Sequence, residues 1–225
     1  MSSFETKGQI ALEDLIAQRV ARDAFMALED AYFDGDKKGR LQASGFARGH
    51  KRSAAGSIKH FYNNETFHEA LQTHGANPSP LRGTSLVVGR LGIFNIVRLN
   101  VPGHKWTNLR RSSTRAALAE LNEHIERKYV QGDFFAEAGA VAEATLFVLG
   151  VMDGEDANGL AQLTQCMVAL PAVDMRSWLY LKTMAEFLKV YDRASNNSQA
   201  DNAVPKLKGS QRKKNTGTED DNGNS

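Results

Sequence analysis

Apolar residues recur at steps of three and four positions near the start of the chain. The repeating positions between residues 10 and 33 are Leu12, Leu15, Ile16, Val20, Ala24, Leu28 and Tyr32. At 3.6 residues per turn these side chains share one face, so the pattern predicts an amphipathic helix over 10–33. A second helical stretch is expected over 53–74, where Asn63-Asn64 is the predicted break.

Turn-forming residues separate these elements from their neighbours. Asp34-Gly35-Asp36 predicts a turn after the first helix. Residues 37–52 are basic, contain three glycines and show no clear period, which indicates a loop or a short irregular element. Residues 75–84 hold two prolines and two glycines and predict a second loop.

Runs of β-branched and apolar residues predict two strand pairs. The first pair is 86–88 with 93–101, joined by a tight turn at 89–92. In its second strand Leu99 and Arg98 point to opposite faces, because side chains alternate along a strand. The second pair is 143–152 with 160–170, and the first of these strands is apolar on both faces, as in a central strand.

Two more helices and a polar tail complete the prediction. A helix is expected over 115–129, and a last helix from Asp174, as N-cap, to about Tyr191. Residues 194–225 are too poor in large apolar side chains to form a core, which predicts a disordered tail. The predicted fold class is α+β: one domain over 1–193, in which amphipathic helices pack on two antiparallel strand pairs.

The composition fits a soluble protein. Of the 225 residues 41% are hydrophobic and 24% are charged, and no apolar run approaches the 18 to 20 residues that cross a bilayer. The N-terminus lacks the basic and apolar regions of a signal peptide, so a cytoplasmic protein without membrane contact is expected. The single cysteine, Cys166, excludes an internal disulfide and a zinc site built from cysteines.

The distribution of charge is more informative than the net charge of +2. Residues 37–115, called the basic segment below, carry fourteen Lys or Arg residues and only two acids, Glu65 and Glu69, while both flanking regions are acidic. Such asymmetry indicates an anionic partner, either nucleic acid or an acidic protein. Folding of the acidic flanks against the basic segment would account for the same pattern.

Two stretches of the basic segment combine residues that bind phosphate. Residues 105–115 lie between a predicted strand and a predicted helix, which Ser113 or Thr114 would cap, and helix N-termini attract anions. Their arginines suit phosphate oxygens, and their tryptophan offers a face on which a base can stack. Residues 48–52 form the second stretch. The candidate anion- and nucleic-acid-binding residues are Arg48, His50, Lys51, Arg52, Arg98, Lys105, Trp106, Arg110, Arg111 and Arg115.

No motif indicates catalysis. The chain lacks the phosphate-loop, dinucleotide-binding and nucleophile-elbow patterns, and the six histidines do not follow a metal-ligand spacing. Asp153, Glu155 and Asp156 fit a turn between two strands. We therefore expect no catalytic residues, no metal and no cofactor.

Three classes of function remain open. The favoured one is a non-enzymatic accessory protein that binds nucleic acid or another polyanion through the basic segment. The second is a regulatory or interaction module that uses charge complementarity with a partner or with a second copy of itself. The third is an enzyme that acts on a phosphorylated or nucleotide substrate, with a histidine as acid or base.

Overall fold

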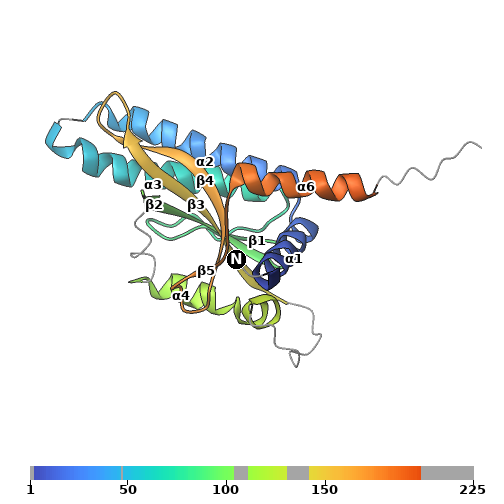
Figure 1. The fold of residues 1–225 in the computed structure, drawn as a ribbon. Helices are drawn as coiled ribbons and strands as arrows, with labels where there is room; N and C mark the ends of the chain where they lie inside the picture. The colour runs from blue at the N-terminus through green and yellow to red at the C-terminus, as the bar shows by residue number, and fades with distance from the viewer. Residues whose placement is uncertain (1–2, 47, 104–110, 131–141, 199–225) are drawn as a thin grey trace, which may run out of the picture.

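The computed structural model describes residues 3–46, 48–103, 111–130 and 142–198 (Figure 1). In this part of the chain three long helices come first, followed by two strands, three helical segments, three strands and a last helix. The elements are α1 (Ser3–Arg19), α2 (Arg22–Ala43), α3 (Arg48–Thr73), β1 (Val88–Leu91), β2 (Phe94–Pro102), α4 (Ser113–Glu120), α5 (Glu123–Ile125), the π-helical turn η2 (Glu126–Val130), β3 (Ala144–Glu155), β4 (Ala161–Pro171), β5 (Trp178–Thr183) and α6 (Met184–Ser198). None of the helices within these ranges is long and apolar enough to cross a membrane.

The strands form one mixed sheet in the order β1-β2-β3-β4-β5. The two predicted antiparallel pairs are present as β1/β2 and β3/β4, but a parallel pairing of β2 with β3 joins them. The fifth strand, β5, pairs antiparallel with β4 and was not predicted. The α+β class is therefore confirmed, whereas the arrangement as two strand pairs is wrong. The segment between β2 and β3 carries α4, α5 and η2, as expected because a parallel connection needs a crossover.

Helices cover the two faces of the sheet unequally (Figure 1). Side chains of α1, α2, α3 and α6 pack with one face of the sheet in the main core, which includes Phe25, Ile96 and Phe187. The opposite face holds a smaller cluster, in which Leu118 of α4 packs near Leu99. β2 alternates as predicted: Val97, Leu99 and Val101 contribute to the smaller cluster, and Arg98 points to the α3 side.

The N-terminal helices differ from the prediction at Gly35. The helix expected over 10–33 is two helices, and the Asp34-Gly35-Asp36 stretch lies inside α2 rather than in a turn. A Cβ atom at Gly35 would lie 2.8 Å from the Cα of Asn63, and one at Gly39 would lie 2.6 Å from the Cα of Lys59. These glycines therefore allow α2 and α3 to pack closely, and most of the predicted loop over 37–52 is helical.

α3 is continuous through the predicted break at Asn63-Asn64. Both asparagines are buried. The side chain of Asn64 makes tertiary hydrogen bonds to Arg98 and to the carbonyl of Ser85, so it does not compete with the helix backbone. The two asparagines therefore face the interior of the protein and do not end a helix.

The last predicted helix begins ten residues too early, because α6 starts at Met184 and not near Asp174. A reciprocal capping box marks its start: the Glu186 amide donates to Thr183 Oγ1 at 3.2 Å, and the Thr183 amide donates to Glu186 Oε2 at 3.1 Å. α6 continues to Ser198, beyond the predicted domain boundary at residue 193. Residues 199–225 of the predicted tail lie outside the described residues.

Candidate anion-binding pocket

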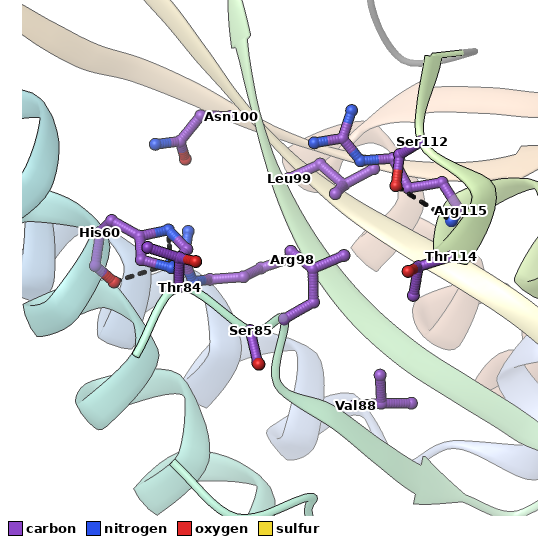
Figure 2. A pocket seen from close by; sticks show the side chains of 11 residues that line it. His60, Thr84, Ser85, Val88, Arg98, Leu99, Asn100, Ser112, Thr114 and Arg115 are labelled. Carbon is purple, nitrogen blue, oxygen red and sulfur yellow. Dashed lines mark hydrogen bonds between the residues drawn. The ribbon is translucent and has the colours of Figure 1, made fainter. Parts of the chain in front are cut away.

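A pocket of about 440 Å³ lies where β1 leaves the edge of β2 (Figure 2). Val88 and Val97 form the last pair of the β1/β2 ladder, and β2 continues to Pro102 beside β3 alone. The walls come from α3, the loop before β1, β2 and the start of α4. The lining residues are His60, Thr84, Ser85, Leu86, Val88, Arg98, Leu99, Asn100, Ser112, Thr114 and Arg115. We call this cavity the Arg98–Arg115 pocket.

Asn64 joins the loop before β1 to α3 beside the pocket. Its Nδ2 donates to the Ser85 carbonyl at 3.0 Å, which ties the loop to α3. The Oδ1 of the same side chain accepts from Arg98. One buried amide therefore bonds both the loop and the arginine, and Ser85 and Arg98 both line the pocket.

Arg98 is a buried cation with neutral partners. It is only 2% exposed, and its Nε and Nη2 donate to Asn64 Oδ1 at 3.1 and 2.7 Å. Nη2 also donates to the His60 carbonyl at 2.8 Å, and the guanidinium carbon lies 5.7 Å from the centre of the Tyr32 ring. Among the described residues no carboxylate forms an ion pair with Arg98. The hydrogen bonds orient the guanidinium, and its charge is left uncompensated.

His60 is held in its neutral form. Its Nδ1 lies 3.2 Å from Arg98 Nη2, and its Nε2 lies 3.2 Å from Asn64 Nδ2. Burial and then the charge of Arg98 lower the pKa of His60 below the ordinary 6.5, although a hydrogen bond with the Thr84 backbone acts in the opposite direction. A protonated ring would meet further N–H donors, so His60 adds no charge of its own at neutral pH.

Arg115 supplies the second cation from the first turn of α4. Ser112 is the N-cap and accepts from the Arg115 amide at 3.4 Å, so neither Ser113 nor Thr114 is the cap that the sequence predicted. The side chain of Arg115 is partly buried, and its Nε is buried with no hydrogen-bond acceptor among the described residues. Burial lowers the pKa of Arg115, yet a guanidinium stays charged at neutral pH.

These groups give the pocket a positive charge that no described lining residue cancels. Among the residues that the structure describes, two arginines line it, and no aspartate or glutamate does. Ser112, Thr114 and Thr84 add hydroxyl groups, and the N-terminus of α4 adds the positive end of a helix dipole. Such an arrangement can bind an anionic group, because guanidinium, hydroxyl and N-terminal amide groups all donate hydrogen bonds to oxyanions.

The predicted site residues fall into separate places. Arg98 and Arg115 both line the Arg98–Arg115 pocket, from opposite sides, and Arg111 is exposed just before the cap of α4. The first turns of α3 contain the predicted group Arg48, His50, Lys51 and Arg52. The side chains of this group that the structure describes, those of His50, Lys51 and Arg52, are not among the residues that line the pocket. Lys105, Trp106 and Arg110 lie outside the described residues.

Part of the basic segment is neutralised inside the fold. Asp36 is 1% exposed and pairs with Lys59 at 3.1 Å and with Arg40 at 2.8 Å. Arg40 also contacts Asp156 at 3.0 Å, and the exposed Arg52 pairs with Glu155 at 3.1 Å. Carboxylates of the acidic flanks therefore form ion pairs with several basic residues of α2 and α3. The two arginines of the pocket have no such carboxylate partner among the described residues.

Sequence reasoning did not assign His60 or Asn64 to a site. In the sequence His60 is one of six histidines without a ligand spacing, and Asn64 fits a helix break. Their contacts with Arg98 span 38 and 34 residues, and no local pattern signals pairings of that separation. Among the residues that the structure describes, no group of three His, Cys, Asp or Glu side chains could hold a metal ion.

Comparison with protein-family models, with curated proteins and with solved structures gives no match to this chain. The function is therefore inferred from the residues of the Arg98–Arg115 pocket and their surroundings.

Proposed function

We propose that this protein binds nucleic acid or a comparable polyanion through the basic segment, without catalysis, and that the Arg98–Arg115 pocket receives one of the ligand's anionic groups. One observation carries the proposal: two arginines from different elements line one pocket, and none of its described lining residues is acidic. An uncompensated guanidinium in a partly enclosed site interacts more strongly with an anion than one in open water.

The surface beyond the pocket supports a ligand with several charges. Arg111 and Arg82 are exposed and have no carboxylate partner among the described residues. Phe46 is 47% exposed just before the basic first turns of α3, where it could stack on an unpaired base. A single-stranded polyanion could therefore contact scattered cations while one of its phosphates enters the pocket.

The surroundings of His60 favour binding over an enzymatic role. An acid or base must reach the substrate with a free ring nitrogen. Both ring nitrogens of His60 lie 3.2 Å from side chains on its own wall of the pocket, Arg98 and Asn64. The alternative of charge-driven self-association is weakened by the internal ion pairs, since Asp36, Glu155 and Asp156 already have basic partners within the chain.

Binding of a labelled single-stranded oligonucleotide, measured by fluorescence anisotropy over a range of salt concentrations, tests the proposal. We expect Arg115→Gln to weaken binding about tenfold and to reduce the salt slope by about one, because one phosphate contact is lost. The loss should be similar for unrelated base sequences, since the pocket reads charge and not base edges.

The matched control is Arg176→Gln. Arg176 is an exposed arginine outside the basic segment and pairs only loosely with Asp174, at 3.5 Å. Arg176→Gln changes the net charge by the same amount as Arg115→Gln. Because Arg176 lies outside the basic segment and the pocket, we expect little change in binding. Equal affinities of the parent, Arg115→Gln and Arg176→Gln proteins would contradict the proposal, as would an affinity that hardly responds to salt.

A further inference from the structure

The charge and the shape of the Arg98–Arg115 pocket define its ligand more narrowly. We infer that the group bound there is a phosphomonoester dianion carried on an organic part of nucleotide size, supplied by the phosphorylated end of a nucleic-acid strand or by a free nucleotide. This inference rests on the proposed function and specifies what enters the pocket.

The first argument is charge matching. Arg98 and Arg115 contribute two positive charges, and the part of the lining that the structure describes contains no carboxylate. A phosphomonoester carries a charge of about −1.5 to −2 at neutral pH. A phosphate within a strand, like a carboxylate, carries only one negative charge and would leave one buried guanidinium partly uncompensated. Because Arg98 is 2% exposed, that remaining charge would stay costly.

The second argument is the shape of the site. The pocket has a volume of about 440 Å³, within the range of roughly 300–1,000 Å³ that small-molecule sites span. Figure 2 shows Arg98 and His60 on one side of the pocket and Ser112, Thr114 and Arg115 on the other. A phosphate within a strand is joined to a nucleotide on each side, and both nucleotides would have to extend out of such a pocket. A terminal phosphate is joined to only one nucleotide.

The third argument concerns the lining beside the charges. Leu86, Val88 and Leu99 form an apolar part of the wall next to the arginines. A bare inorganic anion would leave this part in water, whereas the sugar or base attached to a phosphate would cover it. The hydroxyl of Ser112 is free to donate, since its oxygen accepts from the Arg115 amide. The pocket thus offers donors for an oxyanion and an apolar surface for the group that carries it.

The test compares oligonucleotides of one sequence that differ only at the end: 5′-phosphate, 3′-phosphate or hydroxyl at both ends. We expect at least one phosphorylated form to bind about tenfold more tightly than the hydroxyl form, because it adds charge-assisted hydrogen bonds. Arg115→Gln should remove this preference, and Arg176→Gln should keep it. Circular dichroism of each variant verifies that the fold is intact.

Calorimetric titrations with adenosine monophosphate, adenosine and inorganic phosphate distinguish the two sources. One outcome is that the monophosphate binds while adenosine and the oligonucleotides do not. This result would support the inference for a free nucleotide and overturn the proposed nucleic-acid function. Oligonucleotides that bind equally with and without a terminal phosphate would overturn the inference and leave the proposed function standing. Inorganic phosphate that binds as tightly as the monophosphate would overturn the assignment of an organic part.

Discussion

Arg98 is a charged side chain buried among neutral groups, and its environment explains what the pocket can do. Buried charges are usually paired, because transfer from water to a protein interior is costly. Here the partners of the guanidinium are neutral: the Asn64 amide oxygen, the His60 carbonyl and the face of Tyr32. These partners orient the guanidinium without cancelling its charge. An anion that enters the pocket would supply the missing compensation.

Asn64→Asp tests whether this uncompensated charge drives binding. The substitution keeps the shape of the side chain and places a carboxylate against Arg98, where Oδ1 now accepts at 2.7 and 3.1 Å. We expect the fold to persist, since the new ion pair offsets the lost hydrogen bond to Ser85. Oligonucleotide affinity should fall about tenfold or more, because the carboxylate competes for Arg98 and repels the incoming anion.

Anisotropy titrations and thermal unfolding of the same Asn64→Asp preparation provide the measurement. Glu65→Gln is a useful comparison, because it removes a negative charge from an exposed neighbour on α3, whereas Asn64→Asp adds one. We expect that it does not weaken binding. A folded Asn64→Asp protein that binds as tightly as the parent would show that the charge of Arg98 does not contribute.

At the residue scale the sequence predicted some of this site. Strand alternation placed Arg98 on the face opposite Leu99, and the basic composition singled out Arg98 and Arg115. It could not predict that these two arginines share a pocket, because their positions depend on where β1 separates from β2. It also could not show that Lys59 and Arg40 are neutralised by Asp36, which requires the packing of α2 against α3 and β4.

At the scale of elements, the packing of α2 on α3 depends on glycine. Gly35 and Gly39 lie one turn apart in α2 and face Asn63 and Lys59 of α3. Without side chains at these positions the two backbones approach closely, and Lys59 reaches Asp36 and the Ala161 carbonyl, at 2.7 Å from the latter. This contact sets the position of α3, and therefore of the His60 and Asn64 side chains that shape the pocket.

Gly39→Ala should destabilise the protein. Its Cβ would lie 2.5 Å from Lys59 Cγ and 2.6 Å from Lys59 Cα, so α3 must shift. We expect a loss of about 1–3 kcal/mol in the free energy of unfolding from overpacking, even after the gain of up to about 1 kcal/mol in helix propensity. Urea denaturation measures the difference.

Gly56→Ala is the matched control in α3. An added Cβ there meets no heavy atom within 4 Å, so only the propensity term acts, and we expect a gain of about 0.5–1 kcal/mol. Opposite signs for the two glycine-to-alanine changes would support close packing at Gly39. A Gly39→Ala protein as stable as the Gly56→Ala protein would contradict it.

The errors at the level of elements have a common physical origin. Glycine marks either a turn or a close approach of two backbones, and the sequence around Gly35 favoured the turn because two aspartates flank it. Residues 178–191 place apolar side chains at spacings that suit a helix as well as a strand followed by a helix. The capping box at Thr183 and Glu186 is visible in the sequence and would have placed the start of α6 correctly.

At the scale of the whole molecule, ion pairs join segments from opposite ends of the chain. Glu13 of α1 is buried and pairs with Lys182 of β5 and Arg193 of α6. Tyr180 also donates to Glu13, at 3.3 Å, and burial with the nearby carboxylate raises the pKa of the phenol. The acidic N-terminal region is thus held by cations of the C-terminal half, while Asp36 neutralises part of the basic segment. Among the described residues, Arg98 and Arg115 of the pocket have no carboxylate partner, and neither have the exposed Arg82 and Arg111.

The contribution of Glu13 to stability should depend on pH. Burial alone would raise the pKa of Glu13, but Lys182 and Arg193 hold it below the ordinary value of 4.5. A carboxyl whose pKa is lower in the folded state stabilises that state at pH values above 4.5, and the contribution is lost as the pH falls through the folded-state pKa. Glu13→Gln removes the charge at every pH. We therefore expect this variant to be less stable than the parent by about 1–3 kcal/mol at pH 7, with a difference that shrinks below pH 4.5.

Urea denaturation across this range provides the measurement, with the exposed Glu120→Gln as control. A Glu13→Gln deficit that stays constant from pH 7 to pH 3 would contradict the role of the ion pairs, because protonation of Glu13 in the parent would then cost nothing.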